Sequence, residues 1–140
     1  MSAPPKPEGL TITFEDDLVV VRLRGDYDLA VEQYIATVRA EIAARGGYRL
    51  SLMDVTEAGT VTREARHALV NYRDQWNTPG SLALVGASFT VRTLATMMLS
   101  AARMLTRRPI HFRFFATEEE GRAWLAKERE RVKMQRASKP

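Results

Sequence analysis

Two periodicities alternate along the chain and predict its strands and helices. Leu10, Ile12 and Phe14 alternate with polar residues, which is the period of a half-buried strand. A second strand is predicted over residues 18–24, and so few residues separate the two that they can pair only as an antiparallel hairpin. Residues 25–28 interrupt this pattern, so the second strand is expected to end before them.

The next segment has helical spacing. Val31, Ile35, Val38 and Ile42 follow one another at intervals of four, three and four residues, which places them on one face of a helix. Asp28 is the expected N-cap of this helix, and a pair of glycines is expected to end it.

A third strand and a second helix follow. Leu50 and Leu52 alternate through a strand that is expected to end near Asp54. A loop then leads to Thr62, the expected N-cap of the helix. The buried stripe of this helix is predicted to consist of Ala65, Leu69, Tyr72 and Trp76.

Two further strands and two further helices complete the pattern. Residues 82–85 are apolar throughout, as in a strand covered on both faces, and residues 110–115 form the fifth predicted strand. Thr117 and Glu120 have the spacing of a capping box at the start of a fourth helix. The third helix, between these strands, is predicted to bury a stripe made of Val91, Leu94, Met98, Ala101 and Leu105.

The predicted order β-β-α-β-α-β-α-β-α is that of an α/β protein. An initial hairpin followed by strand–helix alternation predicts a mixed five-stranded sheet with four helices, whose later strands run parallel through right-handed crossovers. We expect a single domain over residues 10–126, because 140 residues suit one domain of ordinary size. Residues 1–9 are expected to be a flexible Pro-rich N-terminus, and residues 127–140 a basic extension of the last helix and a tail.

Composition narrows the classes of function. With no Cys and only two His, the sequence excludes disulfides, thiolate metal sites and a multi-histidine metal site within one chain. Glu64 and His67 have the spacing of one carboxylate–histidine half-site, but no second half-site accompanies them. The N-terminal residues lack the apolar stretch of a signal or a membrane span. We therefore expect a cytoplasmic protein that is not an enzyme and holds neither metal nor cofactor.

Charge is distributed unevenly. Residues 1–70 carry 8 Lys or Arg and 11 Asp or Glu, whereas residues 71–140 carry 13 and 6. Between Gln75 and Thr117 there is no acidic residue. This positive field favours an anionic partner. If that partner is a nucleic acid, Arg103, Arg107 and Arg108 would contact it, although no nucleic-acid motif is present. The alternative interpretation is a solvated Arg-rich surface.

Candidate chemistry is expected at the carboxyl ends of the parallel strands, where helix N-termini point outward. Residues 86–90 invite comparison with the G-x-S-x-G nucleophile elbow of hydrolases. Thr90 stands at the second glycine position, and no acidic residue lies between Ser88 and His111, so the comparison fails. Ser88 or Thr90 is instead expected to cap a helix, and could there hold an anion or ligand.

Hydroxyl residues also mark the start of the second helix. Thr60 and Thr62 lie where a phosphate would meet the positive end of a helix dipole, with Arg63 and Arg66 within reach. The alternative is that Thr62 is only an N-cap. A phosphate here would alter a recognition surface without unfolding the domain.

The strand ending at Asp54, the loop leading to the helix at Thr62, and residues 85–92 and 114–125 together resemble the STAS superfamily. This is the domain of bacterial anti-sigma-factor antagonists, and the later segments are similar to a STAS-like branch of small bacterial proteins. The resemblance covers roughly residues 10–126. It implies a non-enzymatic regulatory module that docks a protein partner, a kinase or anti-sigma-type regulator, through the loop and helix after the third strand.

In the antagonists a serine of an Asp-Ser-Ser-Gly-like motif is phosphorylated by the partner kinase. Counting eight residues on from Asp54 places Thr62 at that position, where this chain reads Thr60-Val61-Thr62-Arg63. Thr62 and Thr60 are therefore the candidate phosphoacceptors. Asp54, Arg63 and Arg66 complete the candidate partner-binding residues.

A second hypothesis is that the domain binds a small apolar ligand or lipid, since the superfamily also resembles lipid-carrier domains in fold. The ligand would lie under the third and fourth helices, against the apolar side of residues 91–105 with Phe112, Phe114 and Trp124, which are equally expected as plain core. An exposed strand edge or the helix of Trp124 could also support a homodimer.

Overall fold

The structure, a computed structural model, describes residues 5–45, 48–71, 80–106 and 110–138. Its elements confirm the predicted α/β order and the five-stranded mixed sheet with four helices. In chain order they are β1 (Leu10–Glu15), β2 (Leu18–Tyr27), α1 (Leu29–Arg45), β3 (Arg49–Val61), α2 (Arg63–Asn71), β4 (Gly80–Val85), α3 (Phe89–Thr106), β5 (Ile110–Phe115) and α4 (Glu118–Ala137).

The sheet has the strand order β1-β2-β3-β4-β5. The β1–β2 hairpin is antiparallel, as the short turn required, and the other three pairings are parallel. Strands β1 and β5 are therefore the sheet edges, and β2, β3 and β4 lie between them. Strands β3 and β4 are parallel, so their carboxyl ends point toward the same end of the sheet. The N-termini of α2 and α3 follow these strand ends.

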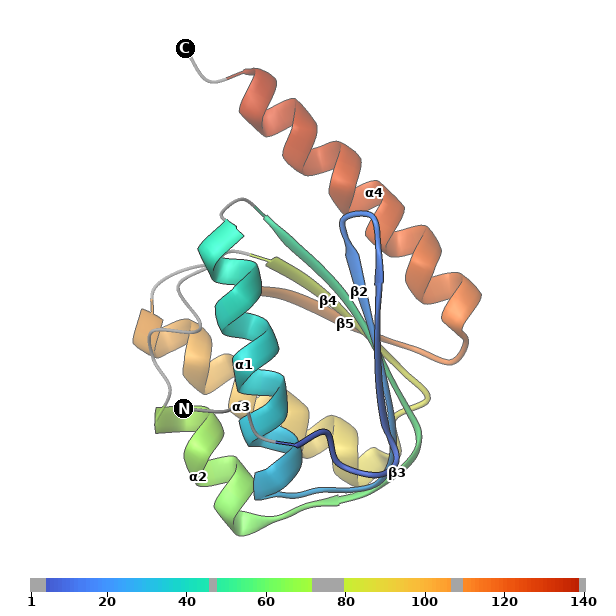
Figure 1. The fold of residues 1–140 in the computed structure, drawn as a ribbon. Coiled ribbons are helices and arrows are strands. Elements are labelled where there is room, and N and C mark those ends of the chain that lie inside the picture. The colour runs from blue at the N-terminus through green and yellow to red at the C-terminus, as the bar shows by residue number, and fades with distance from the viewer. Residues whose placement is uncertain (1–4, 46–47, 72–79, 107–109, 139–140) are drawn as a thin grey trace.

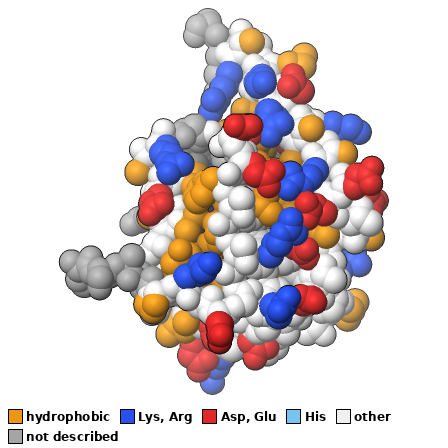
Figure 2. Space-filling model, turned by 45° about the vertical axis from the view of Figure 1, so that its right-hand side comes forward, with side chains coloured by type: hydrophobic (Ala, Val, Ile, Leu, Met, Phe, Trp, Pro, Cys, Tyr) orange, Lys and Arg blue, Asp and Glu red, His pale blue; other side chains and the backbone are white. Residues whose placement is uncertain are grey.

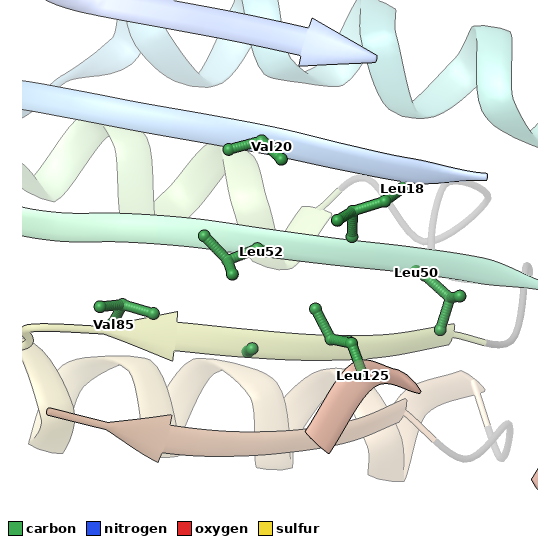
Figure 3. Close-up of a cluster of buried hydrophobic side chains, with 7 residues drawn as sticks. Leu18, Val20, Leu50, Leu52, Val85 and Leu125 are labelled. Carbon is green, nitrogen blue, oxygen red and sulfur yellow. The ribbon is translucent and has the colours of Figure 1, made fainter. Parts of the chain in front are cut away.

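Among the described elements, only helix α4 covers one face of the sheet (Figure 1). Its Leu125 is 1% exposed and packs among alternate residues of the central strands (Figure 3). The helix comes close to β4, because a Cβ on Gly121 would lie only 3.2 Å from a methyl group of Val85. The small residues at this crossing permit a densely packed layer, which consists of Leu18, Val20, Leu50, Leu52, Ala83, Val85 and Leu125.

Helices α1, α2 and α3 cover the opposite face (Figure 1). Val31 of α1 packs against Val19 and Val21 of β2, while Leu99 of α3 packs with Leu84 of β4. Helix α1 approaches the sheet less closely than α4 does. The two faces are therefore packed differently, and the looser one encloses the cavity described below.

Residues 54–61 form a strand, which corrects the predicted loop. Strand β3 runs on to Val61 because β2 also continues past its predicted end, to Tyr27, and the two extensions pair in parallel. Two irregularities interrupt this ladder, and Gly25 adopts a positive φ of 92° within it. The pairing partner lies more than thirty residues away in sequence, so no local pattern could indicate it.

The predicted helix starts are confirmed where the structure describes them. The Asp28 carboxylate accepts the Val31 N–H at 3.0 Å, and the Thr117 hydroxyl accepts the Glu120 N–H at 3.2 Å. Ala65 and Leu69 are buried in α2 as predicted. Tyr72 and Trp76 lie outside the described residues, as does the side chain of Leu105.

Helix α4 continues through residues 127–137 without interruption, and residues 5–9 precede β1. Within the described ranges, no helix combines the length and the apolar character that crossing a membrane requires.

Candidate functional site

The N-terminus of α2 begins at Thr62, at the end of the long strand β3. The Thr62 hydroxyl accepts the Ala65 N–H at 3.3 Å, and its backbone N–H donates to the Tyr27 carbonyl at 3.0 Å. Thr62 is therefore the N-cap, as predicted, and it is half-buried. Its hydroxyl already has a structural role.

Thr60, the other candidate phosphoacceptor, is exposed. Its backbone N–H donates to the Asp26 carboxylate at 2.9 Å, which holds the two strand extensions together. A Cβ on Gly59 would lie 2.1 Å from the same carboxylate oxygen, so a larger residue here would displace the Asp26 side chain. The Thr60 side chain is exposed near the end of strand β3.

The first turns of α2 and the end of β3 form an exposed polar surface, which we call the α2 edge. Its exposed side chains are those of Glu57, Thr60, Arg63, Glu64 and His67. Arg66 is only half-buried, and its Nε has no hydrogen-bond partner in the part of the chain that the structure describes. The structure thus brings together four of the predicted site residues: Thr60, Thr62, Arg63 and Arg66.

Asp54 is separated from this edge. Seven residues of strand follow it before Thr62, which corresponds to roughly 20 Å of extended chain. Its carboxylate accepts the N–H and the hydroxyl of Thr56, and it also accepts a hydrogen bond from Arg22 at 3.2 Å. Asp54 therefore belongs to the face of the sheet that α4 covers.

A network of ion pairs connects Asp54 to the start of α4. Arg22 contacts both Asp54 and Glu118, at 3.2 and 2.6 Å, and Arg122 contacts Glu118 at 2.8 Å and Glu15 through two hydrogen bonds. Hydrogen bonds from Arg22 and Arg122 lower the pKa of Glu118 to about 2. Charged side chains of both signs are interspersed on this side of the molecule (Figure 2). The network ties β1, β2 and β3 to α4.

The α3 N-terminus carries the second predicted segment. The Ser88 hydroxyl accepts the Val91 N–H at 3.2 Å, so Ser88 is the N-cap, while Thr90 is exposed in the first turn. His111 pairs with Ser81 at the amino end of the sheet, whereas Ser88 follows the carboxyl end of β4. Ser88 and His111, the two residues of the hydrolase comparison, therefore lie at opposite ends of the sheet.

An apolar cavity of about 160 Å³ lies between the sheet and the α1–α3 layer. Ile12 of the edge strand and Ile42 of α1 line it and are only half-buried, so it reaches the surface between β1 and α1. Hydrophobic side chains come to the surface in a hollow on this side (Figure 2). Further lining is supplied by Val38, Met53, Leu69, Val91, Ala95 and Leu99.

This cavity differs from the predicted pocket. Residues of α3 line it as expected, but Trp124 packs on the opposite face of the sheet, with its ring 5.7 Å from that of Phe115. Phe112 and Phe114 pack edge-on against each other beside α3 and belong to the core there. The reason is that α4 crosses the other face, so a pocket cannot lie under α3 and α4 together.

Two arginines and a glutamate that were not among the predicted site residues lie on the cavity wall or next to it. Glu32 is fully buried and accepts hydrogen bonds from Arg39 and from the Tyr27 hydroxyl. Burial and the neighbouring Glu32 raise the pKa of Tyr27, so its phenol stays protonated and donates. Arg39 and Arg49 both line the cavity. A signal existed: Glu32 and Arg39 occupy inward positions of α1, and Arg49 alternates with buried leucines.

Other predicted features lie outside the described residues or apart from any site. Arg107 and Arg108 are not described, nor is the side chain of Arg103, so the nucleic-acid alternative stays a prediction. Glu64 and His67 are exposed on α2, and no three His, Asp or Glu side chains in the described ranges gather as a metal ion would require.

Comparison with solved structures shows the fold. The chain is similar to the anti-sigma factor antagonist SpoIIAA in its unphosphorylated form, with 17% identity, a TM-score of 0.55 and coverage of 87% of this chain and 97% of that chain. It is also similar to a protein of the DUF3478 family with a SpoIIAA-like fold from Shewanella loihica PV-4, with 18% identity, a TM-score of 0.59 and coverage of 89% and 98%. No family model and no curated protein matches the sequence. The fold is therefore STAS-like, as the sequence resemblance implied.

Replacing Thr62 by alanine removes the acceptor of the Ala65 N–H. We expect Thr62→Ala to lower the free energy of unfolding by about 1 kcal/mol, measured by urea denaturation. The matched control is Thr60→Ala, whose exposed hydroxyl makes no such contact and whose effect should stay within about 0.5 kcal/mol. Equal losses in the two variants would contradict the N-cap role.

The lowered pKa of Glu118 makes stability depend on pH. A carboxyl group whose pKa is lower in the folded state stabilises the fold above its unfolded pKa, and this contribution is lost as the pH falls. Stability should therefore decline between about pH 4.5 and pH 2, and Glu118→Gln should flatten the decline in urea midpoints measured across this range. Glu119→Gln is the control. A decline of the same size in all three proteins would exclude Glu118 as a cause.

Proposed function

We propose that this chain is a non-enzymatic regulatory module that binds a partner protein through the α2 edge. The observation that carries the proposal is the exposure of this edge in a chain with a SpoIIAA-like fold. The similar SpoIIAA structure is that of an anti-sigma factor antagonist, a protein named for its action on another protein.

The composition of the edge supports this role. Its exposed side chains carry both signs of charge, with Arg63 and Glu64 adjacent and Glu57 paired to Arg24 at 3.1 Å on the surface. Exposed charges of this kind steer association and determine which partner fits more than they stabilise the fold. A partner would be an anti-sigma-type regulator or a kinase, as the resemblance implies.

Regulation by phosphate at this edge is part of the proposal, and Thr60 is the better acceptor. Its side chain is exposed, whereas the Thr62 hydroxyl is half-buried and already caps α2. A phosphate on Thr60 would add about −1.5 to −2 charges beside the N-terminus of α2 and the exposed Arg63. The surface that a partner reads would change, while the strand end that holds Thr60 would remain.

The docking surface can be tested by retaining partners from an extract of the source cells on the tagged full chain. Arg63→Glu and Thr60→Glu should each reduce the retained partner by about tenfold or more, measured by quantitative mass spectrometry. Lys127→Glu is the matched control, because it makes the same charge change as Arg63→Glu at an exposed position of α4 on the opposite face. A partner set that is identical for all four proteins would exclude the α2 edge.

A second candidate function is binding of a small apolar molecule. The observation that favours it is the cavity of about 160 Å³ between the sheet and α1–α3, which is close to the size that accepts benzene in an engineered core. Pockets of this kind are mostly apolar with a few polar groups, as this one is.

An uncharged probe, octan-1-ol, tests the cavity. We expect binding to the wild type in an NMR titration and about tenfold weaker binding to Ala95→Leu, whose larger side chain would occupy part of the cavity. Ala126→Leu adds the same bulk at an exposed position of α4 and should leave the affinity unchanged. Equal binding to the wild type and to the filled variant would reject this function.

A further inference from the structure

Arg49 is the unusual residue of the cavity wall. It is only 9% exposed, and its Nη1 has no hydrogen-bond partner among the described residues. The first residue of β3, it lies beside Gly80, where a Cβ would come within 3.3 Å of the guanidinium Nε. Glycine at this position therefore leaves room for the arginine side chain to lie along the cavity wall.

The buried carboxylates among the described residues already have partners. Two buried carboxylates occur in the described ranges, Glu32 and Glu128. Glu32 accepts from Arg39 and Tyr27, while Glu128, on the α4 side, accepts from Ser81 and Arg131. No ion pair of Arg49 is found within the residues that the structure describes. A buried guanidinium without an anion is costly, because it has lost water and gained no counter-charge.

The pKa of Arg49 agrees with a buried guanidinium that has no ion pair among the described residues. Burial and the nearby Arg39 guanidinium lower the pKa of Arg49 to about 10. Arg49 nevertheless stays protonated near neutral pH, so the cavity wall carries a positive charge. An anion inside the cavity would relieve both the desolvation and the repulsion from Arg39.

We propose that the cavity binds a small organic monocarboxylic acid, with the carboxylate on Arg49 and the aliphatic or aromatic body among the apolar side chains. This inference rests on the second candidate function, binding in the cavity, and adds the head group that the site selects. The planar guanidinium offers two parallel N–H donors that match the two oxygens of a carboxylate.

The rest of the cavity suits such a ligand. Ser51 lies two residues beyond Arg49 on the same face of β3 and also lines the cavity, so it adds a hydroxyl donor near the head group. The remaining wall is mainly aliphatic, including Val38, Val91 and Leu99. The volume fits a ring or a chain of about six to eight carbons.

The test compares octanoate with octan-1-ol on the full chain by isothermal titration calorimetry. Wild type should bind octanoate about tenfold to a hundredfold more tightly than the alcohol, because a charge-assisted hydrogen bond is added to the same apolar contacts. Arg49→Met should abolish this preference by weakening octanoate alone. Equal affinities in the wild type would overturn the assignment of Arg49 while leaving cavity binding intact, and binding of neither probe would overturn both.

Two further measurements keep the test decisive. Arg24→Met, at an exposed position of β2, makes the same substitution away from the cavity and should keep the preference for octanoate. Without ligand, Arg49→Met should melt at the wild-type temperature or above, because an unpaired buried charge is gone. A lower melting temperature in both Arg49→Met and Arg49→Gln would show that the guanidinium is satisfied within the protein and would overturn the proposal. Arg49→Gln also replaces Arg49→Met in the affinity comparison if Arg49→Met does not fold.

Discussion

Burial of the central strands on both faces is the constraint on which the rest of the structure depends. Leu52 and Ala83 have no exposed surface, and both lie under α4, while Met53 and Leu84 of the same strands face α1–α3. A sheet that is apolar on two faces needs a helical layer on each. The crossover helices α1–α3 supply one layer, and α4 is the one described helix on the other face.

The two helical layers pack on the sheet with different closeness, and this difference creates the cavity. On the α4 side, Gly121 and Ala83 allow a close approach of the helix to the sheet. On the other side, three helices meet over one sheet, and their side chains leave about 160 Å³ beneath them. Among the buried ionic groups, Glu128 on the α4 side and Glu32 on the α1 side have partners, whereas the Arg49 guanidinium lies on the cavity wall with an unpartnered Nη1.

The two proposed binding surfaces share one short element. Nine residues of helix α2 lie within the described ranges, and its first turn presents Arg63 and Glu64 on the α2 edge. Its last turns carry Leu69 into the cavity lining. The edge is exposed because β3 runs on beyond the part of the sheet that β4 pairs with, so Thr60 and Thr62 lie past the covered core. The cavity lies beneath the helices because most of its walls are the inward faces of the same elements.

Much of the fold could be predicted from the sequence, because it depends on local periodicity and capping. The alternation of Leu10, Ile12 and Phe14, the spacing of Val31 to Ile42 in α1, and the caps at Asp28 and Thr117 are all contained in a few consecutive residues. The N-cap at Thr62 was predictable for the same reason, and so was the position of the α2 edge beside it.

Tertiary structure alone decided the features that depend on residues distant in sequence. Residues 54–61 became a strand because β2 pairs with them, and this separated Asp54 from Thr62. The position of the cavity followed from which face α4 covers, and this removed Trp124 from the pocket. An arginine at an inward position can be read from the chain, but whether an anion meets it depends on how Glu32, Arg39 and Arg49 come together in space.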